Sequence, residues 1–583
     1  MQIEEKLSNL RKEMKKRGLD AYLITGSDPH GSEYVPPRWR TRQWISGFTG
    51  SAGTVVVTLK EAFLWVDSRY YIQGGQEIEG SPFKLKKLGF PGELTPVEWL
   101  AAPPQKGFKV GVDHESLTLE EKKELVNRGI SLIEIDDLLN NIWLDRPGLP
   151  FSKVTPLDDE IAGLSSRAKI DMIRELLSEV GCSDTLIASL DDIAWILNLR
   201  GSDIPFNPVF LSFLLIGQNK VVLFTDPRRL EEGLLNNSVE IRNYAEVYDY
   251  LQKELNGSAV LYLSPQKSNV RLCSALNKAV KIVEGRDFSS DLKSRKNRRE
   301  IEGMRRAHIE DALAMVKFLH TVSQATKRYT ELSIAEELEK FRAESSDYLG
   351  PSFSPIAGFK AHGALAHYSA TPESSVELIG DGLLVLDSGG QYETGTTDIT
   401  RTLLFGEASE QMKRDYTLVL KGNLALTRQV FPEQTAGYQL DAFARQFLWQ
   451  EGLNYGHGTG HGVGFCLNVH EGPQNISPKP IAVALEEGMV ISNEPGIYRE
   501  GVHGVRLENL VVVQASEKGA MGQFYEFEVL TLVPFEKKLI KRELLSDAEI
   551  EQLNGYHERV YRELQEELNE IERAWLRHVT LPL

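Results

Sequence analysis

The chain has 583 residues, of which 41% are hydrophobic and 26% are charged, so it has the composition of an ordinary globular protein. This length exceeds what one hydrophobic core supports, and roughly two to four domains are expected. The net charge of −17, with a pI near 5.4, argues against a nucleic-acid partner and against an anionic membrane surface.

The cysteines and the hydropathy of the chain indicate the cellular compartment in which the protein is expected. The three cysteines are far apart and odd in number, so neither a disulfide framework nor a cysteine-ligated zinc site is indicated. The first eighteen residues carry charges throughout and lack the apolar stretch of a signal peptide. The longest apolar run, 209–216, is too short to span a bilayer. These features predict a soluble, cytoplasmic protein.

The first part of the chain has the pattern of a small α/β domain. Apolar residues recur at helical spacing within 3–17, and a strand-like run follows at 21–25. Two further apolar runs, 53–58 and 62–66, are separated by three residues and predict a hairpin.

The same order of elements begins again near residue 165. A helical pattern there precedes a strand-like run at 185–188, and the runs 209–216 and 221–224 predict a second hairpin. Repetition of helix, strand and hairpin predicts two copies of one α/β domain.

Two changes of composition indicate the domain boundaries. The Pro-rich stretch 144–156 suits a linker, and the basic cluster KSRKNRRE (293–300) precedes a long helical pattern. A final charged helix is predicted at roughly 545–577. The predicted domains are 1–150, 151–298 and 299–583, the last with a C-terminal segment from about residue 530.

The third predicted domain contains a repeat of its own. GLLVLDSGGQYETG (382–395) and GMVISNEPGIYREG (488–501) match in three glycines and a tyrosine at a constant offset of 106. Both stretches continue into apolar strands. Each half therefore supplies a hairpin with two acidic residues; these are Asp387 and Asp398 in one half and Glu494 and Glu508 in the other. The register is imperfect, since Asp387 aligns with Asn493.

Four carboxylates on buried strands would repel one another unless they were protonated or bound to cations. A pair of divalent metal ions resolves this repulsion, because carboxylates bridge neighbouring cations. His461, in the Gly-rich stretch YGHGTGHGVG, is the candidate nitrogen ligand. A hard, oxygen-rich ligand set suits manganese, cobalt or zinc. Each signal is weak alone, but six of the twelve histidines fall between 362 and 503.

Six motifs in order carry a resemblance to a known family: HYSAT (367–371), LDSGGQYETGTTDITRT (386–402), GHGTGHGVG (456–464), NVHEGP (468–473), NEPG (493–496) and GVRLEN (504–509). The chain resembles the dinuclear pita-bread metallopeptidases, above all the three-domain Xaa-Pro aminopeptidases (aminopeptidase P), over essentially its whole length. The resemblance implies an α/β (α+β) fold class. Two creatinase-type N-terminal domains would precede a pita-bread catalytic domain with an internal pseudo-twofold repeat.

The resemblance also implies the site residues. The metal ligands would be Asp387, Asp398, His461, Glu494 and Glu508, with Asp398 and Glu508 bridging two divalent ions, manganese first and zinc or cobalt as alternatives. Three further histidines would line the site and contact substrate: His367, His457 and His470. Glu494 would also move a proton, and Arg506 would orient a bridging ligand.

The implied activity is removal of the N-terminal residue from peptides with proline in the second position (Xaa-Pro-Yaa), by attack of a water or hydroxide that bridges the metals. The Xaa-Pro bond has no N–H and carries a bulky ring, so a shaped pocket is needed, with His367 and His470 as candidate walls. The expected partners are peptide substrates and a second copy in a homodimer, without nucleic acid or membrane.

Two other functions stay open at this point. One is a prolidase acting on Xaa-Pro dipeptides, and the other is a non-catalytic pita-bread protein used for interaction. His503 receives no role and is expected at the surface, whereas His362 is expected to be a positioning or loop residue.

Overall fold

The structure is a computed structural model that describes residues 1–583 except 236–237, 256 and 326. The chain divides into two compact units. The first comprises Met1–Asp159 and Leu164–Asp291, and the second comprises Glu160–Gly163 and Leu292–Leu583.

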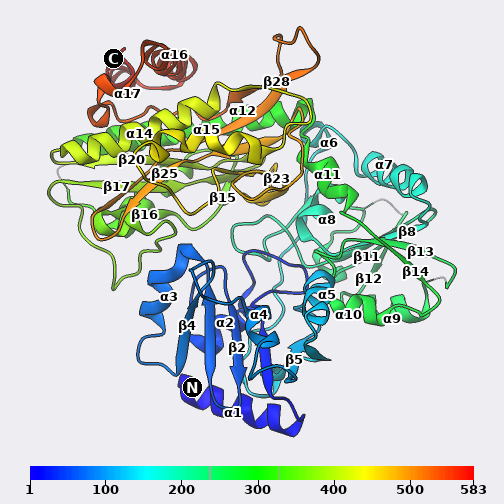
Figure 1. The fold of residues 1–583 in the computed structure, drawn as a ribbon. Coiled ribbons are helices and arrows are strands. Elements are labelled where there is room, and N and C mark those ends of the chain that lie inside the picture. Colours follow the sequence, from blue (N-terminus) through cyan, green and yellow to red (C-terminus); the bar gives the residue numbers. More distant parts are fainter. Residues whose placement is uncertain (236–237, 256, 326) are drawn as a thin grey trace. The chain divides into compact units, whose positions relative to one another are not determined.

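The first unit contains the two predicted copies (Figure 1). The elements of the first copy are α1 (Ile3–Lys16), β1 (Ala21–Ile24), α2 (Thr41–Ser46), β2 (Thr54–Thr58), β3 (Ala62–Val66), α3 (Tyr71–Glu77), β4 (Phe83–Lys87), α4 (Pro96–Ala101), β5 (Lys109–Asp113), α5 (Leu119–Asn127) and β6 (Ser131–Ile135). The elements from there to residue 294 are β7 (Thr155–Pro156), α6 (Asp159–Ala162), α7 (Ser166–Glu179), β8 (Asp184–Ile187), α8 (Leu190–Leu197), β9 (Leu199–Arg200), β10 (Phe213–Gly217), β11 (Val221–Phe224), β12 (Val239–Arg242), α9 (Glu246–Lys253), β13 (Val260–Leu263), α10 (Val270–Ala275), β14 (Lys281–Glu284) and α11 (Phe288–Ser294).

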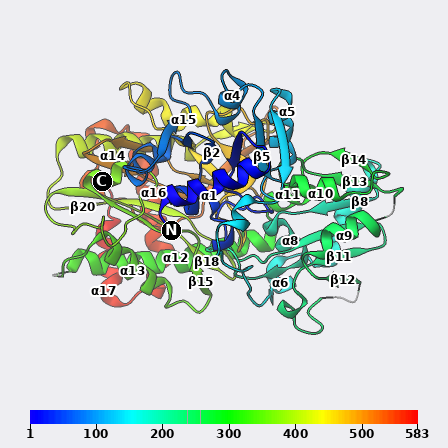
Figure 2. The ribbon, with the colours of Figure 1, turned by 90° about the horizontal axis from the view of Figure 1, so that it is seen from below.

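The two copies have the same sheet topology, which confirms the predicted duplication. The strand orders are β4-β3-β2-β1-β5-β6 and β12-β11-β10-β8-β13-β14. In both sheets the three central strands pair antiparallel and the outer pairs are parallel. The predicted apolar positions Leu7, Leu10 and Met14 bury one face of α1 against the first sheet. Seen from below in Figure 2, α1 lies in front of this sheet.

The second unit contains the predicted acidic hairpins. Its elements are α12 (Arg298–Gln324), α13 (Glu331–Arg342), β15 (Tyr348–Pro351), β16 (Ile356–Phe359), β17 (Gly382–Ser388), β18 (Gly390–Tyr392), β19 (Gly395–Thr396), β20 (Ile399–Phe405), α14 (Glu410–Thr427), β21 (Val430–Pro432), α15 (Gly437–Trp449), β22 (Gly460–Gly462), β23 (Glu471–Ile476), β24 (Val490–Asn493), β25 (Gly496–Arg499), β26 (His503–Arg506), β27 (Asn509–Ala515), β28 (Phe524–Val529), α16 (Asp547–Leu564) and α17 (Glu570–Val579).

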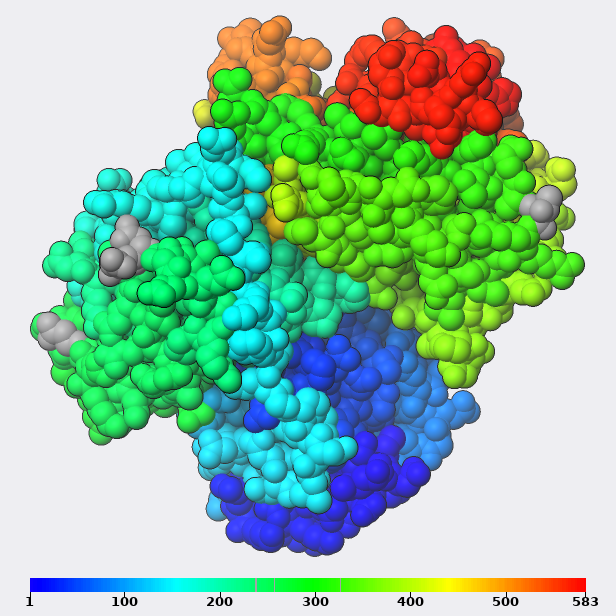
Figure 3. Space-filling view, turned by 180° about the vertical axis from the view of Figure 1, so that it is seen from behind, coloured from blue at the N-terminus to red at the C-terminus, as the bar shows by residue number. Residues whose placement is uncertain are grey.

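Both predicted hairpins form. β17 pairs antiparallel with β20, and β24 pairs antiparallel with β27. Alternate residues of β17 face different helices, because Leu383 packs in a core with α14 whereas Leu384 and Leu386 pack in a core with α12 and α13. The strand is therefore buried along its whole length. The C-terminal helices α16 and α17 pack against the same α12 and α13 core. On the surface in Figure 3, the red C-terminal segment lies against the green segment.

Two sequence-based expectations differ from the structure. The single helix predicted at roughly 545–577 is two helices, because Asn569 caps the start of α17 in a capping box with Glu572. His503, expected at the surface, is only 1% exposed, and its Nε2 lies 2.9 Å from the carboxylate of Asp415. Its partner lies 88 residues away in sequence, so no local pattern announces the contact.

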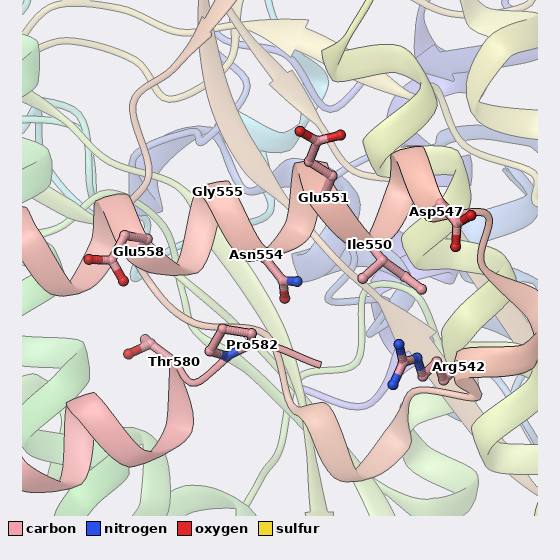
Figure 4. A pocket seen from close by; sticks show the side chains of 9 residues that line it. All are labelled: Arg542, Asp547, Ile550, Glu551, Asn554, Gly555, Glu558, Thr580 and Pro582. Atoms are coloured by element: carbon pink, nitrogen blue, oxygen red, sulfur yellow. The ribbon is translucent and has the colours of Figure 1, made fainter.

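A cavity of about 580 Å³ lies beside α16 and the C-terminal tail, with lining that includes Asp547, Glu551 and Thr580 (Figure 4). None of its lining residues belongs to the predicted site. Among the described residues, no helix combines the length and apolarity needed to cross a bilayer.

Candidate metal centre

The four predicted carboxylates lie at the ends of the two hairpins. Asp387 is the sixth residue of β17, and Asp398 directly precedes β20. Glu494 directly follows β24, and Glu508 directly precedes β27. Asp387, Asp398 and Glu508 are buried, with exposures of 8%, 4% and 1%. The duplicated hairpins therefore bring acidic groups from distant parts of the chain into one buried region.

Hydrogen bonds across the two halves hold these carboxylates. Thr400 in β20 donates from Oγ1 to Glu508 Oε2 at 2.8 Å, and its carbonyl accepts from the Glu508 N–H at 3.1 Å. Arg506 in β26 donates from Nη2 to Asp387 Oδ2 at 2.5 Å. Each half thus fixes an acidic side chain of the other half.

His461 lies in β22, so the HxxxH spacing with His457 is not that of a helix. Its Nδ1–H donates to the Gly462 carbonyl at 2.9 Å, which leaves Nε2 to act as an acceptor or ligand. Nε2 lies 3.4 Å from Asp398 Oδ2 and 3.6 Å from Glu494 Oε1. The ring therefore faces the carboxylates as a nitrogen ligand would.

One group within this region has the spacing of a metal site. Of the residues that the structure describes, Asp398, His461 and Glu508 offer ligand atoms within 4.8 Å of one another. Asp387 Oδ1, Asp398 Oδ1 and Glu508 Oε1 are buried, and none has a hydrogen-bond partner within the described part of the chain. Buried carboxylate oxygens are costly without compensation. A divalent cation satisfies them, so this donor set fits a metal.

The pKa values of the site residues are shifted as expected for a buried excess of negative charge. Burial raises the pKa of Asp387 and of Glu508, and neighbouring carboxylates raise that of Glu508 further. Burial also raises the pKa of Glu494 to about 7. Burial lowers the pKa of His461, but Asp398 and Glu494 outweigh it and hold that pKa at about 9. In the protein alone, protons compensate the buried charge, and cations would displace them.

A directed chain of hydrogen bonds links Arg506 to His457. Arg506 Nη1 donates to Tyr498 Oη at 2.8 Å, and because arginine only donates, the Tyr498 hydroxyl proton is left for His457 Nε2 at 2.7 Å. His457 Nδ1–H donates in turn to the Gly458 carbonyl at 2.7 Å. His457 is therefore held as the Nδ1–H tautomer.

The two other predicted histidines lie at the edge of this network. The His470 ring meets the His461 ring edge to face, with centroids 4.3 Å apart. His367 directly follows Ala366, whose carbonyl accepts from Arg506 Nη1 at 3.1 Å. The structure therefore brings every predicted site residue to this one region of the second unit.

Other functional candidates escaped sequence reasoning. In the sequence, Tyr498 is marked only as the tyrosine that matches Tyr392 in the repeat. Asp441 and Arg445 in α15 are both buried and fix the 454–459 loop, since Asp441 accepts from Thr459 Oγ1 at 2.6 Å and Arg445 donates to the His457 carbonyl at 2.7 Å. Their spacing of four on a helix is common for surface pairs, so it gave no signal of a role at the site.

Comparison with known proteins gives a consistent result along the chain. Residues 6–142 and 145–300 each match a creatinase/prolidase N-terminal domain. Residues 302–515 match metallopeptidase family M24, and residues 523–583 match the C-terminal region of peptidase M24.

Full-length relatives extend the match. Probable Xaa-Pro aminopeptidase P of Tuber melanosporum is 37% identical, over 99% of this chain and 99% of the relative. X-prolyl aminopeptidase from Caenorhabditis elegans, described as a cytosolic enzyme with a di-nuclear active site, has a TM-score of 0.96 at 34% identity and covers 100% of both chains. Xaa-Pro dipeptidase from Bacillus anthracis, with a TM-score of 0.53 at 26% identity, covers 64% of this chain and 99% of its own. The chain therefore belongs to metallopeptidase family M24 and, within it, to the three-domain Xaa-Pro aminopeptidase group.

Proposed function

We propose that the chain is a metal-dependent exopeptidase that removes the N-terminal residue from Xaa-Pro-Yaa peptides. The observation that carries this proposal is the gathering of Asp398, His461 and Glu508 within 4.8 Å, with buried carboxylate oxygens that lack hydrogen-bond partners among the described residues. The names of relatives that match the whole chain support the substrate class.

The proposed ligands are Asp387, Asp398, His461, Glu494 and Glu508, and the proposed occupants are two divalent ions. Manganese is proposed first because the set is rich in carboxylate oxygen, and zinc or cobalt fits the same donors. When bound, such ions would supply Lewis acidity and would lower the pKa of a water molecule toward neutrality.

The chain's own residues supply the proton transfers and the shape of the pocket. Glu494 Oε1 lies 3.6 Å from His461 Nε2 at the site, and this carboxylate is proposed to move a proton during the reaction. His457 lies at the same site, with its Nε2 2.7 Å from the Tyr498 hydroxyl. His367 and His470 are proposed to contact the proline ring, which needs a shaped wall because its nitrogen offers no N–H.

The other proposed properties concern the whole protein. The proposed domains are 1–150, 151–298 and 299–583, the last with its C-terminal segment from about residue 530. The proposed location is the cytoplasm, which agrees with the description of the C. elegans enzyme as cytosolic. The proposed assembly is a homodimer. Light scattering after size exclusion tests the assembly; a species of 65.5 kDa contradicts the dimer.

Substrate length separates this proposal from a prolidase. We expect Xaa-Pro-Yaa tripeptides to lose their first residue in the presence of manganese, and Xaa-Pro dipeptides to remain intact. Parallel incubations followed by chromatography measure both. A tripeptide with alanine in place of proline is the matched control and should react far more slowly. Cleavage of the dipeptide alone overturns the aminopeptidase proposal, and no cleavage with no bound metal favours an interaction protein.

Arg506→Lys tests the support of the site. Arg506 donates to Asp387, to Tyr498 and to the Ala366 carbonyl, whereas a lysine ammonium cannot span acceptors arranged around a planar guanidinium. We expect roughly a 10- to 100-fold loss of metal affinity or of kcat/KM. Arg499→Lys, in the neighbouring strand β25, is the control. Arg499 pairs with Asp415, and a lysine ammonium can still form an ion pair with that carboxylate. Equal effects of both variants contradict the role of Arg506.

A further inference from the structure

The segment that carries His367 is tied to a buried carboxylate that lies outside every sequence motif. Glu331 is the first residue of α13 and is fully buried, at 0% exposure. Four donors surround its carboxylate; they are Phe359 N–H at 2.8 Å, His362 Nδ1 at 2.9 Å, Tyr368 Oη at 3.0 Å and Val376 N–H at 3.1 Å. These donors span the segment from end to end, so one anion fixes residues 359–376.

The contacts inside the segment are consistent with this arrangement. Because the Tyr368 hydroxyl donates to Glu331, its oxygen is left to accept from Ser374 Oγ at 3.0 Å, and Ser374 Oγ accepts from the Thr371 N–H at 2.9 Å. The His362 ring stacks on Tyr368, with centroids 4.4 Å apart. His362 and Tyr368 therefore lie on either side of His367 in sequence, and both side chains donate to the Glu331 carboxylate.

The opposite side of the segment meets the candidate metal centre. Arg506 donates to the Ala366 carbonyl at 3.1 Å and to Asp387 at 2.5 Å, so it connects the residue before His367 to a predicted ligand. The backbone also packs closely against β26, since a Cβ on Gly504 would lie 1.7 Å from the Gly363 carbonyl oxygen. The segment is thus held between Glu331 on one side and β26 on the other.

We propose that Glu331 is a positioning residue for the reaction, whose buried carboxylate fixes segment 359–376 and thereby sets the place of His367. The kinetic part of this inference rests on the proposed function. Four donors converge on the carboxylate, and only an acceptor with two oxygens satisfies them. Glutamine has nearly the same shape but directs an amide NH₂ at donors, which leaves buried groups unpaired.

Hydrogen exchange of Glu331→Gln tests the clamp without reference to activity. We expect faster exchange of amides in 359–376, including Phe359 and Val376, with unchanged exchange in β17 and β20. Glu549→Gln is the matched control, because Glu549 is a buried carboxylate that caps α16. It should leave 359–376 protected. Unchanged exchange in 359–376 for Glu331→Gln, or faster exchange throughout the second unit, overturns the inference.

A double-mutant cycle tests the link to His367. Glu331→Gln is expected to lower kcat roughly 10- to 100-fold with metal content unchanged, and to cost little more in a His367→Ala background. Losses that multiply in the double variant overturn a role through His367. If Glu331→Gln fails to fold, Tyr368→Phe replaces it in the cycle, because it removes a single donor to Glu331. This variant is expected to lose less kcat, and its loss should likewise add little to that of His367→Ala. Should the wild-type protein cleave no Xaa-Pro peptide, the proposed function fails, while the exchange experiment still decides whether Glu331 clamps the segment.

Discussion

Glu508→Gln is expected to abolish peptide hydrolysis and, in metal-free protein, to raise the melting temperature. Glu508 is buried beside three other carboxylates, and its Oε1 has no hydrogen-bond partner among the described residues. Without cations, Glu508 has to hold a proton to avoid a buried charge, whereas glutamine is neutral without one and still accepts from Thr400 through its carbonyl. With cations, the same change removes a ligand. We expect activity to fall roughly 1,000-fold or more, which corresponds to about 4 kcal/mol of transition-state stabilisation.

Glu508→Gln is therefore expected to melt above the wild type in chelator and below it in saturating manganese. Thermal denaturation measures both melting temperatures, and peptide hydrolysis measures the loss of activity. Glu549→Gln is the matched control, since Glu549 is buried but paired with Lys421 at 2.7 Å. It should melt lower than the wild type in both conditions. A metal-free Glu508→Gln protein that melts below the metal-free wild type contradicts the electrostatic account of the site.

The stabilisation that metal confers is expected to grow as the pH rises. In the protein alone, the pKa of Glu494 is raised from 4.5 to about 7 and that of His461 from 6.5 to about 9. A raised native pKa stabilises the fold below the unfolded pKa, and this stability is lost as the pH rises through the native value. The metal-free protein should therefore lose stability, on the order of a few kcal/mol, between about pH 5 and about pH 9.

The stabilisation by bound metal is expected to increase as the pH rises over this range, because the ligands bind metal in their deprotonated forms. Melting temperatures in chelator and in manganese, at about pH 5.5 and about pH 8.5, give the difference directly. His503, paired with Asp415 outside the cluster, provides a control through His503→Gln, which should keep the same pH trend. A metal effect that does not change with pH contradicts protonation of the cluster.

Much of the fold follows from local patterns and repetition. The two N-terminal copies and the hairpins at Asp387 and Glu494 follow from strand-length apolar runs that recur at fixed spacing. The break between α16 and α17 is also encoded locally, in the capping box that Asn569 forms with Glu572. Helix ends are decided by such single residues, so an apolar period alone cannot place them.

The candidate site divides along similar lines. Asp398, His461 and Glu508 stand in motifs, and their residue types already favour a metal. Glu331 has no such signal, because its role comes from four donors that lie 28 to 45 residues away in sequence. The prediction that His503 lies at the surface is wrong for the same reason, because its partner Asp415 lies 88 residues away in sequence. Contacts of this kind depend on tertiary packing, which a single sequence does not reveal.

The exchange of hydrogen bonds between the hairpins has a consequence for how such a chain can change. Thr400 serves a carboxylate of the later half and Arg506 serves one of the earlier half, so the duplicated halves have become interdependent. A chimera that takes one hairpin from a divergent relative would inherit donors without their acceptors. The two hairpins would have to be transplanted together for the candidate metal centre to keep these hydrogen bonds.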